Sequence, residues 1–131
     1  DKDYDLLVGQ RSDRRDYSGL RLLSSYVSIF LNRALFKLPD FRDFNFVYLW
    51  KTDLVKPMLP LHSNGVFLCT EILIRARDAG ARVGVAYAEY RPRVAGTSTV
   101  GRPMVMVKTF GQVLRFFALW KLGQVRKTTF P

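Results

Sequence analysis

The chain has 131 residues, of which 48% are hydrophobic and 14% aromatic, so it can bury the core of one domain and is not a disordered tail. Its 21 basic and 11 acidic residues give a net charge of +10, which predicts an anionic partner such as nucleic acid, phospholipid headgroups or a sugar nucleotide. One cysteine and one histidine exclude a disulfide framework and argue against a zinc site or a Ser–His–Asp triad.

The first elements are a strand and a long helix. Residues 4–8 are mostly apolar and predict a strand that a turn closes at Gly9-Gln10-Arg11. Ser18 is a candidate cap for a helix over residues 18–36. We expect one face of this helix to be core, and it carries Leu20, Leu23, Val27, Phe30 and Ala34. The opposite face is either a phosphate-binding stripe or a solvated one, and it carries Arg21, Ser25, Ser28 and Asn32.

The middle of the chain predicts a turn, a strand and a short helix. Residues 37–43 contain Pro39 and predict the turn, and residues 44–50 favour a strand by their aromatic and β-branched content. Residues 51–59 predict a short helix, which Pro57 kinks or delays. Asp43 is either a functional carboxylate or the structural ion-pair partner of its neighbour Arg42.

Residues 63–98 carry the most informative pattern. Residues 66–79 predict a helix with an apolar face that includes Cys69, and Gly80 ends it because glycine adopts the left-handed conformation at little cost. Residues 83–87 predict a strand. The basic loop that follows offers guanidinium groups, hydroxyls and a close backbone to a phosphate-bearing ligand; it reads Arg91-Pro92-Arg93-Val94-Ala95-Gly96-Thr97-Ser98.

The order of these residues resembles the C-terminal half of a family 2 glycosyltransferase catalytic domain, of the kind that acts on polyprenyl phosphates. That pattern runs G-F-x-x-x-x-E-hydrophobic-L-x-R-A-x-x-x-G, then a strand, then R-P-R-x-x-G-x-S. The matching residues here are Gly65-Val66-Phe67, Glu71-Ile72-Leu73-Ile74-Arg75-Ala76, Gly80, Arg91-Pro92-Arg93, Gly96 and Ser98. The alternative is an ordinary helix–strand unit with a basic surface loop.

The resemblance implies an α/β fold, namely the C-terminal half of a GT-A α/β/α sandwich, and a chain that is part of a larger enzyme. That enzyme would transfer a sugar from a nucleotide-sugar donor to a polyprenyl phosphate or a glycan at the cytoplasmic face of the membrane. The chain alone is then expected to be inactive or nearly so. A divalent metal, Mg or Mn, is implied, with ligands outside these residues; we interpret Asp1 and Asp3 as solvated charges and not as its D-x-D motif.

The resemblance also assigns roles to particular residues. Arg91, Arg93, Gly96 and Ser98 would hold the donor diphosphate. Arg11, Arg21 and Ser25 would hold the acceptor phosphate, and Glu71 would lie at the edge of the site, where it can also pair with Arg75. Asp43 would be the catalytic or acceptor-holding carboxylate; however, Phe44-Asn45-Phe46 stands where the family has S-G-F, and an ion pair with a neighbouring arginine is the structural alternative.

Residues 104–122 predict a long amphipathic helix. Its apolar stripe includes Phe110, Phe117 and Trp120, with basic residues beside it, which suits a helix in the interface of an anionic membrane. The alternative is a terminal helix packed on the core. We therefore divide the chain into a catalytic part, residues 1–103, and an interfacial helix with a basic tail, residues 104–131.

Two other function classes stay open, a basic nucleic-acid-binding domain and a membrane-surface module without catalysis. Nucleic acid is not the partner that we expect, because the aromatic residues lie in apolar runs and do not alternate with basic ones.

Overall fold

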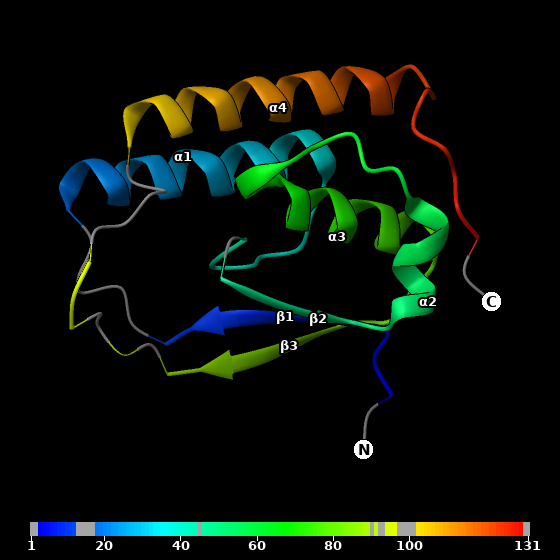
Figure 1. Cartoon of the computed structure of the whole chain (residues 1–131), viewed down its shortest axis with the longest axis horizontal. Coiled ribbons are helices and arrows are strands. Elements are labelled where there is room, and N and C mark those ends of the chain that lie inside the picture. Colours follow the sequence, from blue (N-terminus) through cyan, green and yellow to red (C-terminus); the bar gives the residue numbers. More distant parts are fainter. Residues whose placement is uncertain are drawn as a thin grey trace.

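The computed structural model describes residues 3–12, 18–44, 46–89, 91, 94–96 and 102–129. Within these residues the chain forms an α/β structure with a small mixed sheet and four α-helices. In Figure 1 the helices all lie on one side of the sheet, and α4 is the farthest from it. The α/β class predicted from the sequence is thereby confirmed.

The sheet has the strand order β2-β1-β3. The central strand β1 (Leu6–Arg11) pairs antiparallel with β2 (Val47–Trp50) and parallel with β3 (Val83–Ala88). The predicted turn after residue 8 is wrong, because Gly9-Gln10-Arg11 continues β1. Glycine is needed there, since a Cβ on Gly9 would lie 2.9 Å from the carbonyl oxygen of Val47 in β2.

The predicted helices are confirmed, and most of the observed helix ends lie within one or two residues of the predicted ends. They are α1 (Gly19–Phe36), α2 (Thr52–Val55) with a 3₁₀ turn at Lys56–Met58, α3 (Leu68–Asp78) after a 3₁₀ turn at Gly65–Phe67, and α4 (Pro103–Lys121). Gly80 ends the α3 segment with a positive φ of 79°, as its position predicted.

One core joins the sheet to the helices. Leu6 and Val8 of β1 are fully buried, and Ile72 and Leu73 of α3 pack into the same cluster. Phe36, at the end of α1, is its aromatic centre, with ring centroids 5.6 to 6.1 Å from four other rings. Those four rings are Phe67, Phe116, Phe117 and Trp120. The last helix therefore shares the core of the residues before it.

The two faces of α1 are reversed relative to the prediction. Leu20, Leu23, Val27 and Phe30, expected in the core, are exposed. The polar stripe lies inward instead, and Asn32 is buried, with its side-chain amide donating to the Ser28 carbonyl at 2.9 Å. The inner face of α1 can be polar because it covers a cavity with polar groups of its own.

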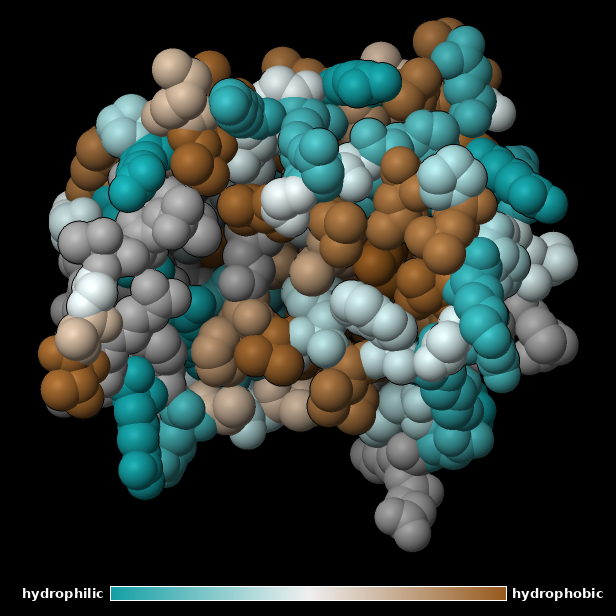
Figure 2. Space-filling view, viewed as in Figure 1, coloured by the Kyte–Doolittle hydropathy of each residue, from teal (hydrophilic) through white to brown (hydrophobic). Residues whose placement is uncertain are grey.

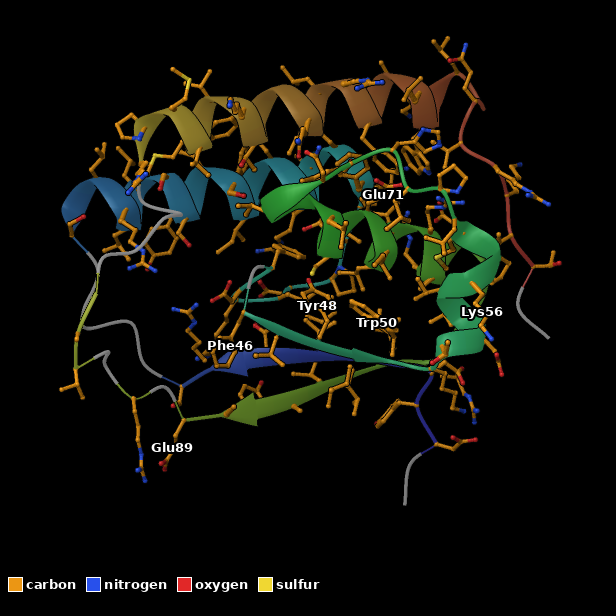
Figure 3. The ribbon with its side chains drawn as sticks, in the orientation of Figure 1. Phe46, Tyr48, Trp50, Lys56, Glu71 and Glu89 are labelled. Carbon is orange, nitrogen blue, oxygen red and sulfur yellow. The ribbon has the colours of Figure 1, made fainter. Side chains whose placement is uncertain are left out.

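Both sides of α3 are buried. The predicted Glu71–Arg75 pair exists, with Arg75 Nη1 3.4 Å from Glu71 Oε1, but it lies inside the domain and not on the helix surface. The other contacts of Glu71 come from the preceding loop, since the backbone N–H groups of His62 and Ser63 donate to its two oxygens at 2.9 and 2.6 Å. Figure 3 shows Glu71 among the helices.

An ion-pair cluster ties the amino end of β1 to both neighbouring strands. Asp5 is buried and accepts hydrogen bonds from the backbone N–H of Arg82 and from Lys51 Nζ. Asp3 is exposed but not isolated, because Lys51 Nζ and Arg82 Nη2 lie 2.8 and 2.9 Å from its carboxylate. The solvated charge predicted for Asp3 is thus one member of a cluster at the entry to the sheet.

Candidate functional site

A cavity of about 110 Å³ lies between the sheet and the helices, at the carboxyl end of β1. Figure 1 shows the carboxyl ends of β1 and β3 and the amino ends of α1 and α4 at the same end of the molecule. In open α/β sheets, ligands bind outside the carboxyl ends of the parallel strands. The lining residues are Arg11, Arg21, Ser24, Ser25, Ser28, Ile29, Leu31, Asp43, Phe44, Val66, Met106, Thr109, Phe110 and Val113.

Four of the residues predicted for the site meet in this cavity. Arg11 comes from the end of β1, Arg21 and Ser25 come from the first two turns of α1, and Asp43 precedes β2. They come from three separate segments, which meet because the end of β1, the start of α1 and the loop before β2 lie at the same end of the molecule (Figure 1). Two guanidinium groups and one carboxylate leave a formal charge of +1 among the lining side chains.

Arg11 and Asp43 form the charged floor of the cavity. Arg11 Nε lies 3.2 Å from Asp43 Oδ2, and both side chains are about nine-tenths buried. The guanidinium carbon also lies 4.6 Å from the ring centroid of Phe46, a distance at which a cation is attracted to an aromatic face. The sequence interpretation paired Asp43 with its neighbour Arg42, whereas the structure pairs it with Arg11.

Gln10 fixes the position of Asp43 and was not singled out from the sequence. Its side chain is buried, and its Nε2 donates to the Asp43 carbonyl at 2.9 Å. Its Oε1 accepts from the backbone N–H groups of Arg42 and Asp43 at 2.7 and 2.9 Å. The available sequence signal for Gln10 was its place between a glycine and an arginine at a strand end. That signal does not reveal that the amide is buried or which groups it binds.

The loop that carries Asp43 is held from the β2 side as well. Tyr48 donates its hydroxyl to the Phe44 carbonyl at 2.9 Å. Burial, then the neighbouring Cys69 and Asp43, raises the pKa of Tyr48 well above its ordinary value of 10.0, so the hydroxyl keeps its proton and remains a donor. Figure 3 shows Tyr48 and Trp50 on the side of β2 that faces α3.

The other walls of the cavity are hydroxyls and apolar side chains. Ser24 and Thr109 each donate their hydroxyl proton to a carbonyl one turn earlier in their own helices, at 2.9 and 2.8 Å, so their oxygens remain as acceptors. Met106, Phe110 and Val113 of α4, the helix farthest from the sheet, add apolar surface. The cavity therefore offers cations from β1 and α1 together with a hydrophobic wall from α4.

The remaining predicted site residues are not in this cavity. Glu71 is fully buried elsewhere, and its oxygens are occupied by the loop and by Arg75. Arg91 and Gly96 are exposed, Gly96 has a positive φ of 93°, and neither lines the cavity. Arg93 and Ser98 lie outside the described residues.

The three aromatic residues predicted for the membrane interface are partly buried against the rest of the domain. Phe110 lines the cavity. Phe117 and Trp120 pack edge-on against Phe36, at centroid distances of 5.7 and 5.6 Å. Trp120 Nε1 also donates to Asp78 Oδ2 at 2.7 Å. Phe117 and Trp120 pack against the domain because Phe36, the last residue of α1, presents an aromatic ring to both.

A second cavity, of about 440 Å³, lies beside the C-terminal segment, with Trp120, Arg126 and Lys127 in its wall. It is larger, but the buried cation there, Arg75, already contacts Glu71 and the Arg126 carbonyl. We consider the smaller cavity the candidate site because charged groups from three separate segments converge on it. Among the described residues, no three His, Cys, Asp or Glu side chains are grouped to hold a metal ion.

Comparison of the chain with family models, with curated proteins and with solved structures found no match. The functional interpretation of the cavity therefore depends on its own chemistry and on the residue pattern described above.

Proposed function

We propose that the cavity binds the phosphate of a polyprenyl-phosphate acceptor, and that the chain is part of a GT-A-type glycosyltransferase. The reaction proposed is transfer of a sugar from a nucleotide-sugar donor to that lipid phosphate or to a glycan. The observation that carries the proposal is the meeting of Arg11, Arg21 and Ser25 in one cavity with an apolar wall. Guanidinium groups bind phosphate oxygens through charge-assisted hydrogen bonds, which are stronger than neutral ones.

The apolar wall distinguishes a lipid phosphate from a free one. Met106, Phe110 and Val113 contribute hydrophobic surface to the same cavity as the arginines. A ligand with a charged head and a hydrocarbon tail matches both kinds of lining, whereas inorganic phosphate uses the charged groups only. In this proposal Asp43 orients Arg11 toward the phosphate through their ion pair, and Gln10 keeps Asp43 in place.

The donor side of the proposal depends on the resemblance. Arg91, Arg93, Gly96 and Ser98 would hold the diphosphate as it becomes the leaving group, where fixed cations lower the barrier. A divalent metal would be bound outside these residues and would supply further charge to the same group. Acceptor binding, and not turnover, is therefore the direct test with this chain.

Titration with farnesyl phosphate, followed by calorimetry or by chemical shifts of α1 amides, tests the proposal. The Arg21→Gln variant is expected to bind at least about tenfold more weakly, because one charged hydrogen bond is worth about 1.5–3 kcal/mol. Arg33→Gln is the matched control, since Arg33 lies on the same helix but pairs with Asp40 at the surface. The proposal is rejected if farnesol binds as tightly as farnesyl phosphate, or if both variants bind alike.

A further inference from the structure

The outer face of α1 is a continuous hydrophobic stripe that no described element covers. Leu20 and Leu23 are each 61% exposed and Phe30 is 70% exposed, with Val27 between them. These residues recur every three or four positions, so they project from one side of the helix. A stripe of this length on a helix of 18 residues is one continuous patch and not a set of scattered exposed residues, and patches of this kind mark interaction surfaces.

The outer face of α4 adds a second set of exposed hydrophobic residues, with cations among them. Met104, Val107 and Leu114 are exposed there, as are Lys108 and Arg115. Figure 2 shows hydrophobic side chains interleaved with hydrophilic ones along the edge formed by α4. The two helices contact one another and run in the same direction (Figure 1).

The charge on these two helices has one sign. Neither α1 nor α4 contains an Asp or a Glu, although the chain has 11 acidic residues. Arg21 lines the cavity and Arg33 pairs with Asp40, so the outward cations are those of α4. They are Lys108, Arg115 and Lys121. A second copy of the chain would bring cations against cations across a symmetric contact, whereas an anionic surface complements them.

We propose that the outer faces of α1 and α4 dock the protein on an anionic phospholipid bilayer. The α1 stripe enters the boundary between headgroups and acyl chains, and the α4 cations contact lipid phosphates. Among the described residues, none of the helices combines the length and the hydropathy that a membrane span requires. This docking rests on the proposed function, whose lipid acceptor lies in a membrane. It assigns the interface to the stripe of α1, whereas the sequence pattern predicted it at Phe110, Phe117 and Trp120.

Vesicle co-sedimentation of the 131-residue chain tests the surface, with phosphatidylcholine vesicles that contain about 30% phosphatidylglycerol. The double variant Leu23→Gln/Phe30→Gln is expected to partition at least about tenfold more weakly, because two hydrophobic side chains no longer leave water. The matched control is Leu49→Gln/Tyr87→Gln, whose residues are 64% and 74% exposed but belong to the sheet. Thermal melts by circular dichroism check that both variants fold.

The outcomes separate this inference from the acceptor proposal. The inference holds if wild type and the sheet variant sediment with the vesicles while the α1 variant stays in solution. It is overturned if the two double variants sediment equally, if wild type ignores anionic vesicles, or if sedimentation velocity shows a dimer that only the α1 variant dissociates. The vesicles contain no polyprenyl phosphate, so the result does not depend on the acceptor proposal. Arg21→Gln, which is expected to weaken acceptor binding, should sediment with these vesicles like wild type.

Discussion

Arg11 and Asp43 are 32 residues apart in the sequence, yet their side chains form a nearly buried ion pair with Nε and Oδ2 separated by 3.2 Å. The pair links the central strand to the loop before β2 and forms the floor of the cavity. Its energetics can be measured apart from any ligand.

Arg11→Gln is expected to destabilise the fold by about 3 kcal/mol, because it leaves the Asp43 carboxylate buried without its cation. Asp43→Asn should cost less, since the Arg11 guanidinium retains the Phe46 ring. Urea unfolding of both single variants and of Arg11→Gln/Asp43→Asn gives the coupling energy. The double variant should recover part of the loss; strictly additive losses would mean that the two groups do not interact.

Glu71→Gln tests the carboxylate that holds the loop before α3. The amide presents an N–H to one of two backbone donors, His62 N–H or Ser63 N–H, so one buried hydrogen bond is lost and a donor is left without an acceptor. We expect a loss of about 2–4 kcal/mol by urea unfolding. Glu89→Gln, at an exposed position (Figure 3), is the matched control and should change stability by less than about 0.5 kcal/mol. A Glu71 variant as stable as this control would contradict the anchoring role.

Gly9→Ala and Gly111→Ala should have opposite effects. At Gly9 the new methyl group would meet the backbone of Val47 at 2.9 Å, so the β1–β2 pair must shift, at an expected cost of about 1–3 kcal/mol. At Gly111, on the exposed side of α4, nothing lies within 4 Å, and alanine should stabilise the helix by about 0.5–1 kcal/mol. Thermal unfolding of the two variants measures the sign of each change in stability. A Gly9→Ala variant as stable as wild type would show that β1 and β2 can move apart at no cost.

Asp5 should make stability depend on acid pH. The backbone N–H of Arg82 and the side chain of Lys51 hold the pKa of Asp5 well below its ordinary value of 3.8. A carboxyl of this kind contributes stability that is fully present above its unfolded pKa and is lost as the pH falls through the folded pKa. Between about pH 5 and pH 2, wild type should therefore lose more thermal stability than Asp5→Asn.

The control for the acid profile is Asp53→Asn, because Asp53 is exposed and its ion pair with Lys56 Nζ is long, at 3.9 Å. Its melting temperature should follow that of wild type at every pH. If the Asp5 variant also follows wild type, the cluster of Asp3, Asp5, Lys51 and Arg82 does not hold a charge in the folded state.

Local sequence pattern was sufficient for the positions of the helices, because each has its own period and end signals. Ser18, Gly80 and Pro103 all lie within two residues of a helix end. It was less accurate for the strands, since it placed a turn where β1 continues to Arg11 and began the next strand at residue 44 and not at Val47. Pattern was not sufficient for the pairing of β1 with β2, since the paired residues are 38 positions apart for Gly9 with Val47 and 44 for Leu6 with Trp50, and contact at such a separation leaves no local signal.

The orientation of α1 shows where periodicity fails. Both faces of this helix have a regular stripe, and the hydrophobic one was assigned to the core by default. The polar stripe lies inward because Arg11 and Asp43 have already made that region polar, and their positions depend on tertiary contacts. Arg11, Arg21, Ser25 and Asp43 were thus predicted as candidates one by one, while Gln10, which aligns the group, was found only in the structure.

Two consecutive residues of β1 contact Asp43. Gln10 binds the backbone of Asp43, and Arg11 pairs with the carboxylate of Asp43. The cavity floor is consequently built into the sheet, whereas its walls belong to two helices that pack side by side. A ligand that spread α1 from α4 would still meet the Arg11 guanidinium, which belongs to the strand, but it would carry Arg21 and Ser25 away with α1. The head of the proposed ligand therefore limits how far its tail can open the helices, so selectivity for the two parts would evolve together.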